Sequence, residues 1–259
     1  MDQVFDLNPH LTNRGRADYP CPHGACDGSG YVLDEEENVA RPCACRDQRI
    51  ALARSRSLLH EIPKRFRDVA FDREPVTSIL ESMGPYVRRH LREFCDRIDA
   101  KLAAGEGLWF QGPRGTGKTT LAMLISQHAL RARRAVAIYT GPQLLTAIRT
   151  TYDDSSPQSY TQLMDRLRRV DLLHLEDLAV ARTNEWVLEQ LYTVVNDRYQ
   201  DERSIIFTAD VEAPPDLGRH VGERTYSRLM EMCGEPIPMF GEDQREPHPR
   251  LAPLREPSS

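Results

Sequence analysis

A glycine-rich run with one lysine and two threonines, GPRGTGKTT at residues 112–120, has the residue types and spacing of a phosphate-binding loop. It fits the pattern Gly, four residues, Gly-Lys-Thr, and lies between a strand-like run and a helical pattern, which disfavours a chance glycine-rich turn. Its glycines would turn backbone N–H groups toward an anion, Lys118 would contact the β- and γ-phosphates, and Thr119 would ligate Mg²⁺. The run predicts a nucleoside triphosphate site made by Gly112, Pro113, Arg114, Gly115, Thr116, Gly117, Lys118, Thr119 and Thr120.

Two adjacent acids follow a second apolar run, in VDLLHLEDLAV. A phosphate-loop enzyme needs a carboxylate at the tip of a neighbouring strand to hold Mg²⁺, and a group that polarises the attacking water. We assign the first role to Glu176 and the second to Asp177; a solvated turn is the alternative. His174 should project to the same face as Glu176, and we interpret it as a hydrogen-bonded sheet histidine rather than a catalyst.

Four of the six cysteines lie near the start of the chain, as Cys21, Cys26, Cys43 and Cys45. They form two close pairs separated by a loop, as a tetrahedral Zn²⁺ site requires. The first pair is spaced more widely than usual, so His23 stays open as a substitute ligand. A segment of ~30 residues buries too little core to fold alone, so metal ligation would stabilise it. A redox pair or unstructured thiols are the alternatives.

The elements that would position these residues follow an α/β pattern. Four short apolar runs are typical of strands buried on both faces of a parallel sheet: 107–112, 135–140, 171–177 and 204–210. Helical patterns lie between them at 118–132, 141–152 and 184–200. An earlier helical pattern has one apolar face, made by Val87, Leu91, Phe94, Ile98 and Leu102. Alternating strands and helices predict right-handed crossovers and a three-layer domain.

Composition divides the 259 residues into four zones. We expect a Cys-rich zinc-binding module at 1–50, a basic helix and linker at 51–72, the ATPase-like domain at 73–240 and a disordered tail at 241–259. The net charge of −5 disfavours a uniformly basic nucleic-acid binder. No apolar run approaches the ~20 residues of a membrane span, and the first residues lack the layout of a signal peptide, so we expect a cytoplasmic protein without a membrane partner.

The order of several motifs resembles the DnaC/IstB family of AAA+ ATPases, which includes bacterial replicative-helicase loaders and transposition ATPases. The resemblance runs from about residue 62 to 233 and rests on GLWFQGPRGTGKTTLA, AVAIYTGPQLLTAIR, DLLHLEDLAV, NEWVLEQLYTVVNDRYQDERSIIFTAD and GERTYSRLMEMC. It implies a P-loop AAA+ core with a parallel sheet, ATP as the nucleotide and Mg²⁺ as its metal. The short proline-rich remainder after Cys233 predicts that no C-terminal helical lid follows, as in the helicase-loader branch.

The resemblance also implies roles for residues outside the phosphate loop. Asp210 corresponds to the polar sensor that faces the γ-phosphate, with Thr208 two positions earlier. Arg228 corresponds to an arginine finger that reaches the ATP of a neighbouring subunit, with Arg224 as the alternative; a salt-bridged helix face is the other reading of both. Such a finger implies self-association, and Arg suits it because its fork pairs with several phosphate oxygens.

Two residues depart from the family pattern. Glu176 stands where Asp is usual, and Asp210 stands where Asn is common. A carboxylate near the γ-phosphate is repelled unless it is protonated, turned away or paired with a cation. We therefore expect ATP binding with slow hydrolysis that depends on assembly.

The resemblance implies an ATP-driven loader that binds the replicative DNA helicase and opens it onto single-stranded DNA. Family members contact single strands through the stretch between the two ATP motifs, which here contains Arg149, Tyr152, Tyr160, Arg166, Arg168 and Arg169. A transposition ATPase on duplex DNA and a nucleotide-dependent adaptor with weakened hydrolysis are the alternatives. The Cys-rich segment favours the loader, because similar zinc knuckles precede some loaders, and it would serve as a docking module for the helicase.

Overall fold

The computed structural model describes residues 21, 23–34, 39–46, 62–153, 155–180, 184–211 and 213–241. The chain divides into two compact units, residues 1–56 and residues 57–259, and each is described here by itself. The predicted basic helix at the start of the 51–72 zone lies outside the described residues, as does the tail after residue 241.

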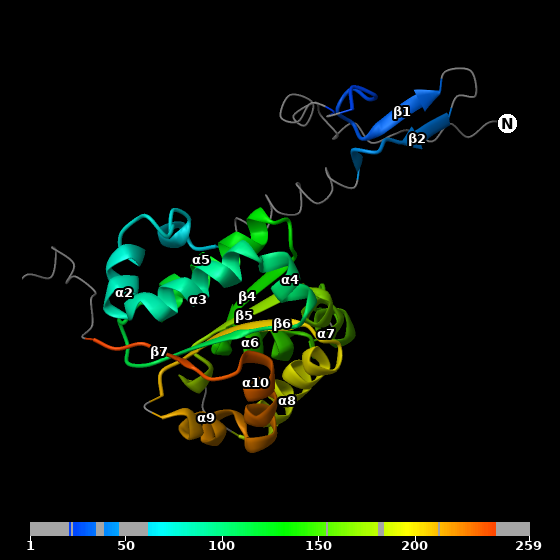
Figure 1. The fold of residues 1–259 in the computed structure, drawn as a ribbon. Helices are drawn as coiled ribbons and strands as arrows, with labels where there is room; N and C mark the ends of the chain where they lie inside the picture. Colours follow the sequence, from blue (N-terminus) through cyan, green and yellow to red (C-terminus); the bar gives the residue numbers. More distant parts are fainter. Residues whose placement is uncertain are drawn as a thin grey trace, which may run out of the picture. The chain divides into compact units, whose positions relative to one another are not determined.

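The first unit contains a small antiparallel hairpin that the sequence patterns did not predict. Its strands are β1 (Tyr31–Asp34) and β2 (Val39–Pro42), paired from Tyr31 opposite Pro42 to Asp34 opposite Val39. Beyond this ladder, the Cys43 N–H donates to the Gly30 carbonyl at 2.9 Å. The hairpin therefore brings the two cysteine-bearing segments, which flank it in the sequence, to the same end (blue in Figure 1).

The second unit is built on a five-stranded parallel sheet in the order β4-β5-β6-β3-β7. Four of its strands coincide with the predicted apolar runs: β3 (Leu108–Gln111), β4 (Val136–Thr140), β5 (Leu172–Glu176) and β6 (Ser204–Ala209). β3, β5 and β6 are buried along their whole length, as the near-continuous apolar runs indicated.

Helices cover both faces of this sheet, so the predicted α/β three-layer fold is confirmed (Figure 1). One face packs against η1 (Lys64–Phe66), α2 (Val76–Ser82), α3 (Gly84–Asp96), α4 (Ile98–Ala103) and α5 (Lys118–Arg131). The other packs against α6 (Gly141–Thr150), α7 (Tyr160–Arg169), η2 (Leu178–Val180), α8 (Glu185–Gln200), α9 (Pro214–Val221) and α10 (Glu223–Cys233). Side chains alternate between these layers along each strand: in β5, Leu172 joins the first core and Leu173 the second.

The predicted apolar helix before the phosphate loop is two helices. α3 ends at Asp96 and α4 begins at Ile98, with Arg97 between them at φ −109° and ψ 26°. The apolar face continues across this break, because Leu91, Phe94, Ile98 and Leu102 are all buried in the first core. Ile62, Phe66 and Val69 belong to that core as well, so the segment before residue 73 packs as part of the second unit.

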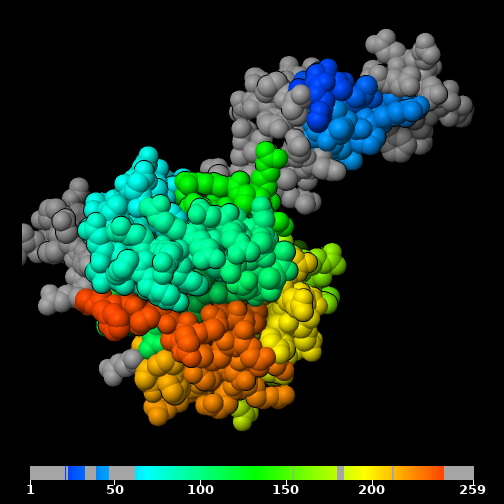
Figure 2. All heavy atoms as spheres, in the orientation of Figure 1, coloured from blue at the N-terminus to red at the C-terminus, as the bar shows by residue number. Residues whose placement is uncertain are grey.

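A fifth strand comes from a proline-containing segment that carried no strand signal. β7 (Ile237–Pro238) pairs in parallel with the end of β3, and the Met239 N–H donates to the Gln111 carbonyl at 2.6 Å. A Cβ at Gly112 would lie 2.2 Å from the Met239 carbonyl oxygen, so the close approach requires glycine there. In Figure 2 this segment (red) runs along the surface between α10 (orange) and the helices of residues 76–103.

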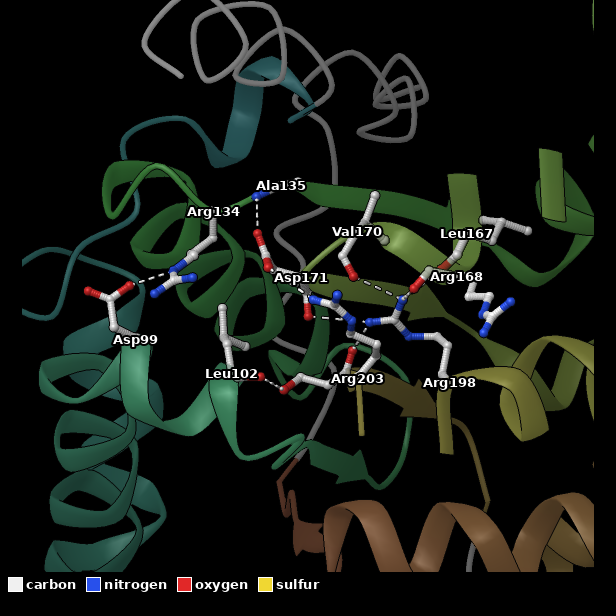
Figure 3. Close-up of polar contacts among 11 residues, drawn as sticks. Asp99, Leu102, Arg134, Ala135, Leu167, Arg168, Val170, Asp171, Arg198 and Arg203 are labelled. Carbon is white, nitrogen blue, oxygen red and sulfur yellow. Dashed lines mark hydrogen bonds and ion pairs between the residues drawn. The ribbon is translucent and has the colours of Figure 1, made fainter. Parts of the chain in front are cut away.

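At the amino-terminal ends of β5 and β6, a buried arginine joins several segments (Figure 3). The Arg198 guanidinium of α8 donates to backbone carbonyls of Leu167, Arg168, Val170, Asp171 and Ser204. Burial, together with nearby Arg203, lowers the pKa of Arg198 to about 9. These bonds satisfy carbonyls at the end of α7 and fix the start of β5 against the start of β6.

Candidate nucleotide-binding site

The phosphate loop, both acids and Asp210 line one cavity of about 680 Å³ at the carboxyl ends of β3, β5 and β6. This volume lies within the ~300–1,000 Å³ of small-molecule sites. The carboxyl edge of a parallel sheet is where α/β proteins bind ligands, because loops rather than helices cover it. The structure therefore brings together residues that are far apart in the sequence, from Arg114 to Asp210.

The loop itself connects β3 to α5 with backbone conformations that need glycine. Gly115 and Gly117 have φ values of 79° and 95°, and a Cβ on Gly117 would lie 2.5 Å from the Ile79 side chain. Lys118 is buried and its Nζ donates to the carbonyls of Gly112 at 2.8 Å and Pro113 at 2.6 Å. The lysine thus folds back over the loop, as a phosphate-binding lysine does when it covers an anion held by the backbone.

Asp210 is the carboxylate that holds this lysine. Its Oδ1 lies 2.6 Å from Lys118 Nζ, and its Oδ2 accepts a hydrogen bond from Arg114 Nε at 3.0 Å. Of the three alternatives for a carboxylate near the γ-phosphate (protonated, turned away or paired with a cation), Asp210 is paired, and with two cations. Asp210 therefore forms an ion pair with the same lysine that a triphosphate would contact.

Glu176 lies beside Thr119, the other residue assigned to the metal. Its Oε2 accepts hydrogen bonds from Thr119 Oγ1 at 2.7 Å and Thr208 Oγ1 at 3.0 Å, and its Oε1 contacts His174 Nε2. Burial raises the pKa of Glu176, but the His174 contact and the threonine bonds more than offset this, so the pKa is lowered. An ionised carboxylate and a hydroxyl at the cavity wall are the oxygen ligands that Mg²⁺ prefers, so these residues fit the metal.

Asp177 stands next to Glu176 in a conformation that non-glycine residues rarely adopt. Its φ is 53°, and its N–H donates to Thr208 Oγ1 at 3.0 Å. Burial raises the pKa of Asp177, as do the charges of Asp210 and Glu176. The strand end is therefore shaped to present two neighbouring acids in different environments, one held ionised and the other with raised proton affinity.

Part of the lining of the cavity comes from the segment before α3. Its residues there are Pro63, Arg65, Phe66, Val69, Pro75 and Ile79. The Gln127 side-chain amide of α5 donates to the Phe66 carbonyl, and the Arg65 guanidinium lies 4.4 Å from the Phe66 ring centre. The segment IPKRFRDVAFD marked the start of the resemblance, and its apolar spacing was the available signal for this part of the lining.

The two candidate arginine fingers lie on α10, against α8. Arg228 Nε donates to Asn196 Oδ1 at 2.7 Å, and its guanidinium lies 4.5 Å from the Tyr199 ring centre. Arg224 is exposed and its guanidinium lies 4.6 Å from the Tyr192 ring centre. Neither arginine is among the described residues that line the cavity.

Aromatic side chains and an arginine gather on the surface formed by α6, α7 and the start of α8. Tyr152 stacks on Tyr160 with ring centres 5.9 Å apart, and meets Trp186 edge-on at 6.5 Å. The Arg149 guanidinium lies 4.7 Å from the Trp186 ring centre. Tyr152 is 57% exposed, so the cluster is accessible; we call these four residues the aromatic cluster.

The two other arginines of this stretch whose ion pairs are described have acidic partners within the chain. Arg168 pairs with Asp201, and Arg169 pairs with Asp165 at 2.8 Å. The residues between the ATP motifs that were grouped by sequence therefore separate into the aromatic cluster and an ion-paired helix end.

In the first unit, the thiols of Cys21, Cys26, Cys43 and Cys45 lie within 4.8 Å of one another. Two Sγ–Sγ distances are 3.8 Å, between Cys21 and Cys43, and 3.5 Å, between Cys26 and Cys45. Four sulfurs at ~2.3 Å from a tetrahedral Zn²⁺ are roughly 3.8 Å apart, so the cluster fits that metal. His23 is exposed and lies outside the cluster, which supplies four ligands without it.

The electrostatics of the thiols also suit a metal. Although burial opposes it, hydrogen bonds from the backbone of Cys26, His23 and Ala25 lower the pKa of Cys21 to about 6. Burial and the neighbouring thiols raise the pKa of Cys45 to about 12. A bound divalent cation would favour the thiolate form of all four cysteines, including Cys45, because thiolate rather than thiol is the metal ligand.

Comparisons with known proteins agree with this site. The family described as IstB-like ATP binding protein matches residues 101–213, from the helix before the phosphate loop to just beyond Asp210. The chain is 28% identical to the ATP-binding protein of insertion sequence IS1162 from Pseudomonas fluorescens over 193 residues, which cover 71% of this chain and 80% of that protein.

A second relative is the replicative helicase loader DnaC of Escherichia coli, with 26% identity over 53% of this chain and 54% of that protein. The crystal structure of the DnaC helicase loader superposes with a TM-score of 0.58 and 22% identity, covering 69% of this chain and all of that one. The chain is thus similar to IstB-like ATP-binding proteins and to the DnaC helicase loader, whose fold it shares, and the resemblance predicted from the sequence is confirmed.

Among the described residues, no helix is both long enough and apolar enough to cross a membrane.

Proposed function

We propose that this protein is an ATP-dependent loader that delivers the replicative DNA helicase onto single-stranded DNA in the cytoplasm. The observation that carries the nucleotide-dependent part is the meeting of Lys118, Thr119, Glu176, Asp177 and Asp210 at one cavity. The relation to DnaC supports the loading part, because that relative is named as a replicative helicase loader. The replication-related role comes from the relatives, and the chemistry comes from the chain's own residues.

In the proposed cycle, ATP binding replaces contacts that the protein now makes with itself. The triphosphate would accept hydrogen bonds from the N–H groups of the loop. It would also draw Lys118 away from Asp210, whose Oδ1 lies 2.6 Å from Lys118 Nζ in the structure. Thr119 and Glu176 would hold Mg²⁺, which neutralises charge on the β- and γ-phosphates. Arg114 remains as a partner for the released Asp210 carboxylate, at 3.0 Å.

Hydrolysis in this scheme needs Asp177 and an arginine from a second copy of the chain. Asp177 would accept the proton of the attacking water, and its raised pKa increases its strength as a base. Arg228, or Arg224 in its place, would supply positive charge as the γ-phosphate leaves. Because neither arginine lines the cavity, turnover would require self-association and would be slow in a dilute monomer.

Single-stranded DNA would contact the aromatic cluster. Exposed aromatic rings stack on bases without regard to sequence, and an arginine nearby adds phosphate or cation–π contacts. The stacked Tyr152 and Tyr160, with Arg149 over Trp186, offer both. The cluster also explains how a chain with net charge −5 could bind a nucleic acid at a local site.

The cysteine cluster would hold Zn²⁺ and make the first unit a docking module for the helicase. Zinc would supply stability, because a segment of ~30 residues buries too little apolar surface to fold alone. Metal analysis of protein purified without chelator is expected to find one zinc per chain, lost when Cys43 and Cys45 are replaced by Ser. If the unmodified protein contains much less than one zinc per chain, the proposal of a zinc-binding module is wrong.

A second candidate is a transposition ATPase that binds duplex DNA. The observation in its favour is the match to the IS1162 protein, which covers more of this chain than the match to DnaC does. The Asp210–Lys118 pair also suits a nucleotide-dependent adaptor that hydrolyses slowly or not at all.

A pull-down with the replicative helicase of the same organism, with and without ATP, separates these functions. The loader predicts ATP-dependent capture of the helicase, and Lys118→Ala should abolish the ATP dependence without unfolding the protein. Capture of a transposase in place of the helicase would reverse the order of the two candidates. Capture of the helicase by an assembly that lacks measurable hydrolysis would support the adaptor.

A further inference from the structure

A row of buried polar side chains lies behind the proposed metal site, and the phosphate loop and acid pair do not account for it. His174 is fully buried, with its Nδ1 2.8 Å from Ser126 Oγ and its Nε2 2.5 Å from Glu176 Oε1. Ser126 is also fully buried, on the side of α5 that faces β5. Ser126 of α5 is therefore connected through the imidazole of His174 to Glu176, the proposed metal-binding acid.

The partners of the ring determine where its proton lies. A carboxylate oxygen accepts, so the contact with Glu176 Oε1 is a hydrogen bond donated by the Nε2–H of His174. Nδ1 then lies 2.8 Å from the Ser126 hydroxyl, and this second hydrogen bond fixes the orientation of the ring.

The two oxygens of Glu176 are held by different residues. Thr119 and Thr208 both donate to Oε2, the oxygen next to the metal site, whereas His174 contacts Oε1. A glutamate side chain has one more rotatable bond than an aspartate, so its carboxylate needs more restraint to present a fixed oxygen. The imidazole fixes Oε1 from behind, and this leaves Oε2 directed at Thr119.

We propose that His174, itself oriented by Ser126, is a positioning residue that holds Glu176 in the orientation that binds Mg²⁺. This inference rests on the proposed ATP–Mg²⁺ site and names the residues that make a glutamate effective there. Carboxylates that bind metals are usually held by hydrogen bonds from further residues, and loss of such a partner typically lowers metal affinity by ~10- to 100-fold.

The test measures how much Mg²⁺ strengthens nucleotide binding, using a fluorescent ATP analogue titrated with and without Mg²⁺. Phe in place of His174 keeps the ring volume and removes both contacts, so His174→Phe should reduce the Mg²⁺ enhancement about 10-fold or more while affinity without Mg²⁺ stays the same. His174→Gln retains an N–H donor near the position of Nε2 and should restore most of the enhancement. Ser126→Ala should reduce it by a smaller factor, because the ring keeps its contact with Glu176.

Leu172→Ala is the matched control. Leu172 lies on the same face of β5, two residues before His174 and four before Glu176, and it is fully buried in the first core. It should destabilise the protein and leave the Mg²⁺ enhancement unchanged.

An equal loss of Mg²⁺ enhancement in Leu172→Ala, or full enhancement in a folded His174→Phe, would overturn the positioning role. If His174→Phe does not fold, Ser126→Ala and His174→Gln decide: enhancement unchanged in Ser126→Ala and lost in His174→Gln would contradict it. If the unmodified protein shows no Mg²⁺ enhancement, the proposed metal site fails and the inference fails with it.

Discussion

The two edges of the sheet each contain a buried cation, and their partners differ in kind. Lys118, at the carboxyl edge, is 5% exposed and is held by two loop carbonyls and the carboxylate of Asp210. Arg198, at the opposite edge, is 0% exposed and is held by five backbone carbonyls, as Figure 3 shows. A carboxylate on a side chain can rotate away and be replaced by a phosphate, whereas backbone carbonyls fixed at the ends of packed helices and strands cannot. Burial alone therefore does not mark a functional cation, whereas a partner that a ligand can replace does.

Replacing Arg198 should produce the largest loss of stability. Arg198→Met keeps much of the volume but leaves buried carbonyls at the ends of α7, β5 and β6 without donors. Unpaired buried polar groups cost ~1–3 kcal/mol each before relaxation, so we expect an overall loss of roughly 3–5 kcal/mol in the free energy of unfolding. Urea denaturation measures it, with Arg203→Gln as a control of about 0.5 kcal/mol or less, because Arg203 is partly exposed and its ion pair is long, at 3.4 Å. A small loss in Arg198→Met would show that the carbonyls around Arg198 do not depend on its guanidinium.

Replacing Lys118 should affect ligand binding and leave stability nearly unchanged. Lys118→Ala removes the charge that the β- and γ-phosphates would contact, and hydrogen bonds to charged groups contribute ~1.5–3 kcal/mol. ATP affinity should fall by roughly 10- to 100-fold, as measured by equilibrium titration calorimetry. Melting without nucleotide is the control, and a loss of stability as large as that of Arg198→Met would show that the two cations have the same structural role.

The raised pKa of Asp177 gives a prediction about pH. The water-activating base works when it is deprotonated, so single-turnover hydrolysis should fall as pH decreases through a value above the usual range of Asp. Asp177→Asn should lower the hydrolysis rate by ~10²-fold or more and leave ATP affinity within about 3-fold of the unmodified protein. An unchanged rate in Asp177→Asn would remove this residue from the chemistry.

Replacing Asp210 should give the smallest effect, and in the opposite direction. Asp210→Asn removes the charge that competes with the γ-phosphate for Lys118, so ATP should bind about 2- to 10-fold more tightly, a change of ~0.4–1.4 kcal/mol. ADP affinity should change less, because ADP has no γ-phosphate. Weaker ATP binding in this variant would mean that the carboxylate supports the nucleotide rather than excluding it. Arg114→Gln is the matched control, since it alters the exposed partner of Asp210 and leaves Lys118 in place.

Much of the second unit could be predicted from the sequence, because its signals are local. The phosphate loop is a contiguous motif, and the strands β3, β5 and β6 are continuous apolar runs. Parallel topology then places the ends of these strands at one edge, so the meeting of Lys118 with Glu176 follows from the pattern.

The features that escaped prediction depend on pairing between distant segments. β7 has two residues, one of them proline, and is a strand only because β3 presents a free edge to it. The Arg198 network gives no sequence signal, since an arginine in a helical pattern is usually exposed. The partners of His174 likewise come from α5 and from the next residue on its own face of β5, and only the second was visible in the sequence.

The short strand β7 sets a practical boundary for shortening the chain. The carbonyl of Met239 lies against Gly112, the first glycine of the phosphate loop, and the Met239 N–H donates to Gln111. A truncation placed after α10, at the end of the last helix, would strip this support from the loop and expose the edge of β3. Expression fragments that are meant to retain nucleotide binding should therefore extend through residue 240, and affinity tags should be placed beyond it.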